Sequence, residues 1–149
     1  MFEGLINQWV YGGTLAGVLL LFMMPLLARG WPATLWLVFL HLPVYMLHQY
    51  EEHQGDRFRR FINQHMGGGR EVMSPLAVFI INVPGVWGVI GLSTYLAAYM
   101  NPGYGLIAVY LVLVNAVSHV GAGLALRRYN PGLVTSLVLF LPVGVWTWI

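Results

Sequence analysis

The stretch WPATLWLVFLHLPVYMLHQYEEH, residues 31–53, combines a membrane-like apolar run with a cluster of ionisable residues. It begins as an apolar run long enough to cross the ~30 Å hydrocarbon core of a bilayer as a helix. It ends in HQYEEH, residues 48–53, where two adjacent carboxylates stand between two histidines. Ionisable groups are costly in lipid, so such a helix needs neighbours that surround its polar end. We therefore expect a bundle of membrane helices with a polar site inside it.

The composition supports this expectation. Of the 149 residues, 58% are hydrophobic and 8% are charged, whereas a soluble domain has roughly 25% charged residues. The length suits one domain, residues 1–149. The sequence thus predicts an all-α, polytopic membrane helical bundle with about five transmembrane helices. The predicted spans are residues 11–28, 31–50, 76–100, 103–126 and 132–149.

A further, amphipathic helix is predicted over residues 56–66, between the second and third spans. Its apolar side chains recur at i, i+3, i+4, i+7 and i+8, and arginines and amides fill the opposite face. We expect this helix to lie on the membrane surface, with Asp56 as its N-cap. Ser74 and Pro75 are expected to begin the next span as N-cap and first helical residue.

The arginines predict an orientation. All seven basic residues are arginines, and six of them lie on one side of the predicted spans, whereas Arg29 lies on the other. The positive-inside rule places the six-arginine side in the cytoplasm, together with the N-terminus, and places the C-terminus outside. The net charge of +2 is too small to indicate a nucleic-acid partner. The six residues are Arg57, Arg59, Arg60, Arg70, Arg127 and Arg128.

One face of the second span carries most of its polar groups. In a helix that turns by about 100° per residue, His41 lies ~20° from His48 and Glu52 lies ~40° from it. Tyr45 lies ~60° away on one side and Glu51 ~60° away on the other. Because such a stripe is unfavourable in lipid, we expect it to face the interior of the bundle.

Polar residues on two other spans come at a similar depth. At ~1.5 Å per residue, His48, His119, Asn115 and Asn82 all lie about 10–18 Å inside the cytoplasmic ends of their helices. This coincidence predicts one shared polar site. The alternatives are that Asn82 and Asn115 only join helices, that His41 is a packing residue, and that the two glutamates mark the membrane boundary.

Two histidines and one or two carboxylates can bind a single divalent metal ion, with zinc, iron and manganese all compatible. The predicted ligands are His48, Glu52 and His119, with His41 as a further candidate and Glu51 as a ligand or general base. Tyr45, Asn82 and Asn115 are expected around these ligands, and Asn115 is expected to orient an imidazole. Without a metal, His48 and Glu52 could transfer a proton. His53 points about 140° away from His48 and is expected at the water boundary.

The motif His48-x-x-Glu51-Glu52 resembles the HXXEE family of uncharacterised prokaryotic integral membrane proteins. The segments NAVSHVGAGL, residues 115–124, and YNPG, residues 129–132, also resemble that family, and the similarity covers roughly residues 35 to 145. The resemblance implies a location in the inner membrane of a prokaryotic cell. It points to His48, Glu51, Glu52 and His119 as the functional residues, and it implies no particular reaction.

Three functions remain open from the sequence. The first is a metal-dependent or acid–base membrane enzyme that acts on a membrane lipid or a lipid-like small molecule. The second is an accessory subunit of a larger membrane complex, or a homo-oligomer with a structural role. The third is a transporter in which histidines and glutamates carry a proton or a metal ion.

Overall fold

The structure, a computed structural model, describes residues 2–148, so residues 1 and 149 at the ends of the predicted domain lie outside the described part. Within residues 2–148 all secondary structure is helical, which confirms the predicted all-α class. The main helices are α1 (Phe2–Leu27), α2 (Ala33–His53), α3 (Arg57–His65), α4 (Pro75–Ile80), α5 (Gly88–Tyr99), α6 (Leu106–Leu126), α7 (Leu133–Thr135) and α8 (Leu141–Trp148). Short 3-10 turns are η1 (Gln54–Asp56) and η3 (Pro102–Gly105), and π-helical segments are η2 (Ile81–Trp87) and η4 (Ser136–Phe140).

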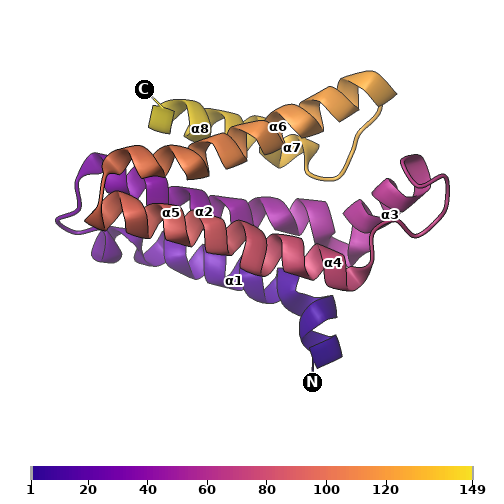
Figure 1. Ribbon diagram of the computed structural model, residues 1–149, viewed down its shortest axis with the longest axis horizontal. Helices are drawn as coiled ribbons and strands as arrows, with labels where there is room; N and C mark the ends of the chain where they lie inside the picture. The colour runs from indigo at the N-terminus through magenta and orange to yellow at the C-terminus, as the bar shows by residue number, and fades with distance from the viewer. Residues whose placement is uncertain (1, 149) are drawn as a thin grey trace.

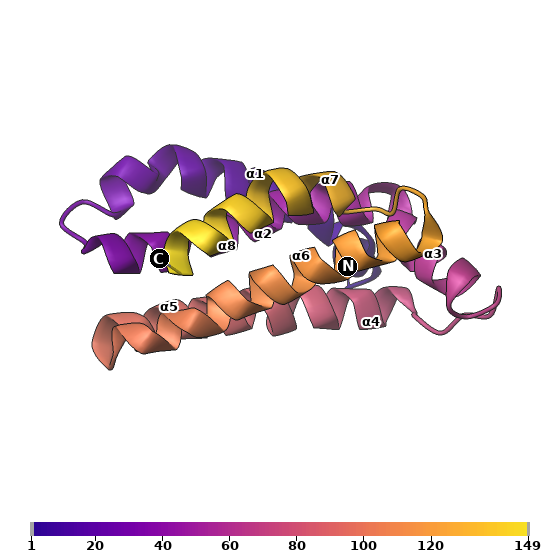
Figure 2. The same ribbon diagram turned by 90° about the horizontal axis from the view of Figure 1, so that it is seen from above.

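Most of these elements run along the long axis of the molecule, and α3 projects at one end (Figure 1). The connections α3–α4 and α6–α7 lie at the α3 end, whereas the α1–α2 and α5–α6 connections lie at the opposite end. Viewed from above, α6 and the α4–α5 rod form one layer, and α1, α2 and α8 form the other (Figure 2).

Three helical segments are long and apolar enough to cross a membrane: Glu3–Leu27, Pro75–Tyr99 and Pro102–Leu126. The α2 helix is not among them, and Leu133–Trp148 is shorter. The five membrane spans expected from the sequence therefore remain a prediction. The lower hydropathy of α2 comes from polar residues that are buried inside the bundle. The helix packs against α1, α5, α6 and α8, and these residues face its neighbours rather than the outside.

The two π-helical segments coincide with prolines. Pro84 lies inside η2, and Pro142 follows η4 by two residues. Proline has no N–H and clashes with the carbonyl one turn earlier, so a wider turn is a common adjustment. These segments matter because η2 and η4 carry residues that pack against the polar end of α2.

A tight turn joins α2 to α3. Gly55 and Asp56 both adopt the left-handed region, with φ values of 64° and 62°. Asp56 precedes α3 as expected, but its side chain does not cap the helix. Its carboxylate instead accepts hydrogen bonds from the guanidinium of Arg59, with Nε 2.9 Å from both oxygens. Ser74 does cap the next helix, since its hydroxyl accepts from the backbone N–H of Ala77 and Pro75 follows it.

Candidate metal centre

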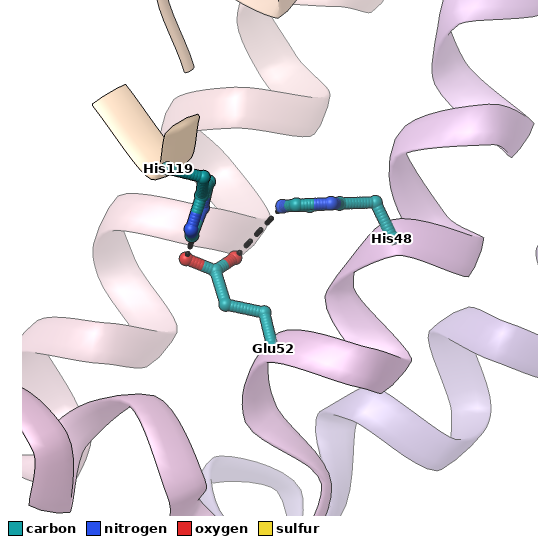
Figure 3. Close-up of side chains that lie close together, drawn as sticks. All are labelled: His48, Glu52 and His119. Carbon is teal, nitrogen blue, oxygen red and sulfur yellow. Dashed lines mark ion pairs between the residues drawn. The ribbon is translucent and has the colours of Figure 1, made fainter. Parts of the chain in front are cut away.

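Three side chains from two helices meet at the α3 end of the bundle. His48 and Glu52 come from successive turns of α2, and His119 comes from α6 (Figure 3). All three are at most 5% exposed. The His48 Nε2 atom lies 3.4 Å from Glu52 Oε2, and the His119 Nε2 atom lies 3.4 Å from Glu52 Oε1. One potential ligand atom from each residue lies within 4.8 Å of the other two, so this group could hold a metal ion.

The hydrogen bonds around His119 determine which ring nitrogen carries its proton. The Asn130 amide nitrogen donates to the backbone carbonyl of His119 at 2.9 Å, which fixes the orientation of the amide. The Asn130 Oδ1 atom then faces His119 Nδ1 at 2.8 Å. Because an amide oxygen can only accept, the hydrogen must lie on Nδ1. In neutral His119 the Nε2 atom therefore presents a lone pair to Glu52.

A second set of hydrogen bonds does the same for His48. The Thr135 hydroxyl donates to the carboxylate of Glu51 and lies 2.8 Å from His48 Nδ1. Since the hydroxyl proton is used on the carboxylate, its oxygen accepts from the Nδ1–H of His48. The neutral ring again presents an unprotonated Nε2 to Glu52, and this atom has no hydrogen-bond partner among the described residues.

Two nitrogen lone pairs thus face one carboxylate. With both rings neutral these groups repel one another, and either a cation between them or a proton on one imidazole removes the repulsion. A metal ion with ligand distances of ~2.0–2.1 Å in a tetrahedral arrangement would set adjacent ligand atoms about 3.3–3.4 Å apart. The two N···O separations of 3.4 Å are close to that spacing, but each reaches a different oxygen of Glu52, so a shared ion would take both oxygens as ligands or require a small rotation of the carboxylate. Both separations are longer than the ~2.7–2.9 Å of a charge-assisted N–H···O hydrogen bond. The geometry therefore fits a bound cation.

Glu51 points away from this centre, into the segment that follows α6. Its Oε1 atom accepts from the Tyr129 hydroxyl at 2.8 Å and from the backbone N–H of Val134 at 3.1 Å. Its Oε2 atom accepts from the backbone N–H of Thr135 at 2.7 Å and from the Thr135 hydroxyl. With both oxygens occupied, the carboxylate is not arranged as the general base that the sequence suggested. Burial and the Glu51 carboxylate raise the pKa of Tyr129, which keeps the phenol protonated as a donor.

Gly132 completes the centre on the side of the α6–α7 connection. Its φ of +97° lies in the left-handed region. A Cβ atom there would lie 2.6 Å from His119 Cε1 and 2.9 Å from His48 Cε1. The connection therefore passes directly over both imidazoles, and only a residue without a side chain fits. Asn130 and Gly132 both belong to the YNPG segment.

Two further histidines of α2 differ in their relation to the centre. His41 is buried but separate, because its Nδ1 atom pairs with the carbonyls of Leu37 and Val38, and the three-residue group does not include it. His53 was expected at the water boundary, and this is wrong. It is buried between Trp9 and Phe58, and its Nε2 atom lies 3.1 Å from Glu52 Oε2.

The predicted surrounding residues fall into two groups. Asn115 donates to the Tyr45 hydroxyl at 2.7 Å and lies beside the centre, but it does not orient an imidazole as expected. That role belongs to Asn130 and Thr135, which the sequence reasoning missed. Asn82 lies outside the group of three proposed ligands, and its side-chain oxygen Oδ1 accepts a hydrogen bond from the Gln49 side-chain amide at 2.9 Å.

A cavity of about 620 Å³ opens beside Glu52 and His119. Its wall is mainly apolar and includes the face of α3 with the regular apolar spacing. Its rim reaches exposed residues on two helices, Val114 of α6 and Ile81 of η2. The lining residues are Tyr45, Glu52, Phe58, Phe61, Ile62, His65, Met66, Ile81, Val86, Leu111, Val114, Asn115, Ser118, His119, Ala122, Ala125, Leu126 and Asn130. His48 lies behind this wall, so the centre meets the cavity through Glu52 and His119.

Comparison with known proteins gives one family. Residues 39–147 match the family described as "Protein of unknown function with HXXEE motif". No curated protein and no solved structure matches the chain. The matched region contains the motif His48-x-x-Glu51-Glu52, His119 and the YNPG segment. The motif glutamates have separate places, since Glu52 faces the two imidazoles and Glu51 anchors the segment that orients His48. The chain belongs to the HXXEE family.

Proposed function

We propose that this protein is a metal-dependent membrane enzyme that acts on a lipid-like substrate. The observation that carries the proposal is the facing of two Nε2 atoms and one buried carboxylate, with a hydrogen-bonded partner behind each imidazole that leaves Nε2 unprotonated in the neutral ring. Imidazoles that bind metals usually donate their other N–H to such a partner, which fixes the ring and its tautomer. Asn130 and Thr135 are in that relation to His119 and His48.

His48, Glu52 and His119 would hold the ion, and two nitrogens with one carboxylate suit zinc, iron or manganese. A divalent ion at this position would supply Lewis acidity, which polarises a substrate oxygen or activates a bound water. Glu51 positions His48 through Thr135. His53 contacts Glu52 Oε2, the same oxygen that faces His48, and would hold the orientation of the carboxylate.

The cavity supports a lipid-like substrate. Its wall is mostly apolar, and the few polar groups converge next to the proposed ion, which is the usual character of a small-molecule site. The exposed apolar residues at its rim would let a molecule enter sideways from the hydrocarbon region of a bilayer.

An acid–base enzyme without a metal is the second candidate. Its support is the contact of the Glu52 carboxylate with three imidazoles at 3.1–3.4 Å, an arrangement in which a proton could be exchanged. In this case at least one imidazole would be protonated and would donate to the carboxylate.

Element analysis separates the two candidates. The purified protein, after dialysis against a weak chelator, should retain about one transition-metal ion per chain, as expected for a site with three protein ligands. His48→Ala should lose it. His41→Ala is the matched control, because it removes a buried histidine from the same helix outside the centre and should leave the metal content unchanged. A folded wild-type protein that binds none of zinc, iron or manganese when they are supplied would rule out the metal-dependent function.

A further inference from the structure

A second polar pair lies in the wall of the cavity, apart from the three proposed ligands. Tyr45 of α2 and Asn115 of α6 meet across the two helices, and both side chains line the cavity. The Tyr45 ring is almost completely buried. The ring stands 5.6 Å from the ring of His48, so the pair borders the centre.

The hydrogen-bonding capacity of this pair is only partly used. The Asn115 amide nitrogen donates to the Tyr45 oxygen at 2.7 Å. Among the described residues, the phenol proton finds no acceptor, and the buried Asn115 Oδ1 atom has no donor. If the amide were turned over, Tyr45 would donate to Asn115, and the free groups would be an amide N–H and a phenol lone pair. In either orientation the pair offers one donor and one acceptor.

Buried polar groups without partners are costly, so native proteins rarely leave them in this state. The donor and the acceptor are adjacent and both border the same hollow. A ligand group in the cavity that accepts one hydrogen bond and donates another would satisfy both.

The remainder of the wall indicates the charge of that ligand. No arginine is among the described lining residues. The α3 arginines Arg57 and Arg60 donate to backbone carbonyls of the turn before α3, Arg57 to that of Gln54 and Arg60 to those of Gly55 and Asp56. An ionised head only accepts hydrogen bonds, so it would leave one member of the pair, the buried Asn115 Oδ1 atom, without a donor.

We propose that Tyr45 and Asn115 recognise the neutral head of a single-chain lipid, a hydroxyl or a primary amide that both donates and accepts. The apolar wall formed by α3, α6 and η2 holds the chain, and the head lies beside Glu52 and His119. This inference deepens the proposed function, since it rests on the cavity being the substrate site, and it names the substrate's functional group.

Native mass spectrometry of the detergent-solubilised protein tests it with four probes of equal chain length: 1-hexadecanol, hexadecanamide, palmitate and hexadecane. The wild type should bind the alcohol and the amide more tightly than the other two. Tyr45→Phe and Asn115→Leu should each weaken binding of the alcohol and the amide about tenfold, the loss of roughly one hydrogen bond. Hexadecane binding should not change in either variant.

Two controls complete the experiment. Tyr50→Phe removes a hydroxyl from an exposed tyrosine of the same helix and should bind all probes as the wild type does. Ala122→Phe fills the cavity wall and should weaken every probe. The proposal would be overturned if the wild type bound palmitate more tightly than hexadecanol. It would also be overturned if Tyr45→Phe weakened hexadecane binding as much as hexadecanol binding, or if Ala122→Phe bound all probes as the wild type does.

Metal content, measured on the same samples, separates this inference from the proposed function. A metal-free wild type that still binds hexadecanol through Tyr45 would end the metal-dependent function and leave the recognition of a neutral head intact. A metal-containing protein whose hexadecanol binding is unchanged in Tyr45→Phe and Asn115→Leu would support the metal-dependent function and overturn the recognition of a neutral head. Both variants should keep the wild-type metal content, because neither residue contacts a proposed ligand atom.

Discussion

Glu51 and Glu52 are neighbours in the chain, yet their carboxylates have different partners. Glu52 faces imidazole rings, and a cation between these groups would neutralise its charge. Glu51 accepts hydrogen bonds from two backbone N–H groups and two hydroxyls. Successive side chains of a helix are rotated by about 100° around its axis, so one of two adjacent glutamates can face the centre while the other reaches a neighbouring segment. The motif thus couples Glu52, a proposed ligand, to the segment that orients His48, a second proposed ligand.

The first prediction compares the two carboxylates. Glu52→Gln keeps the shape but removes the charge that the proposed ion needs, so the protein should lose its metal. Glu51→Gln keeps part of the hydrogen bonding and should lower metal affinity by about 10-fold to 100-fold, as changes to the partners of ligands usually do. Titration with a chromophoric zinc chelator measures both. Equal effects of the two changes would contradict the separate roles.

The second prediction concerns Gly132. Gly132→Ala should weaken metal binding, because the new methyl group would press on both imidazoles at 2.6 and 2.9 Å. The backbone strain of a positive φ costs about 1–3 kcal/mol in addition.

Gly30→Ala is the control for that strain alone. Gly30 has a φ of +85°, and a Cβ there would meet nothing within 4 Å. It should lower the thermal midpoint to a similar extent but leave the metal affinity unchanged. Gly132→Ala with wild-type metal affinity would show that the connection does not constrain the imidazoles.

At the scale of the elements, α3 forms part of the cavity wall. Its apolar side chains face the cavity, and Phe58 stands 6.0 Å from the ring of His119. One residue ties α3 to the connection that follows it. The side-chain oxygen Oδ1 of Asn63 accepts from the backbone N–H groups of Val72 and Met73, and its side-chain Nδ2 donates to the backbone carbonyl of Met73.

The third prediction follows from these three hydrogen bonds. Asn63→Ala should loosen the connection and speed tryptic cleavage after Arg70, which lies within it, because proteases cut where the backbone opens locally. Gln64→Ala removes the exposed neighbouring amide and should cleave at the wild-type rate. If both variants resist trypsin as the wild type does, Asn63 does not hold this connection in place.

The elements also explain what the sequence could predict of the site. His48, Glu52 and His119 follow from the helical angle along α2 and from equal depth on two helices, both of which are regular. Asn130 and Thr135 do not, because an irregular connection, with a turn at Gly132, sets their positions. The Asn-Pro-Gly sequence indicates a turn there, but not which side chains the turn directs inward.

The burial of His53 was missed for a related reason. His53 is the last residue of α2, where helical geometry alone leaves it outside the site. Its environment comes from rings on two other elements, Trp9 of α1 and Phe58 of α3. The packing partners of a helix end depend on tertiary structure, which a pattern along one helix does not contain. The apolar spacing of residues 58–66 identified the apolar face of α3, but the sequence assigned that face to the membrane surface, whereas in the structure it lines the cavity.

At the scale of the whole molecule, charge separates the two ends of the bundle. Six arginines lie in α3 and in the two connections at the α3 end, and Arg29 lies in the α1–α2 connection at the other end (Figure 1). The proposed centre and its cavity are at the arginine-rich end. If that end faces the cytoplasm, as the positive-inside rule predicts, the site lies in the inner half of the bilayer.

The last prediction tests this orientation. The chain has no cysteine, so single cysteines can be introduced without a background. Gly68→Cys lies in the α3–α4 connection, and Gly103→Cys lies in the turn before α6, at opposite ends of the bundle. In intact cells a membrane-impermeant maleimide should label Gly103→Cys, and it should label Gly68→Cys only after the membrane is opened. Both variants should label in detergent, which controls for access. The reverse pattern would place the cavity in the outer half of the bilayer, and the proposed lipid-like substrate would then enter from the opposite leaflet.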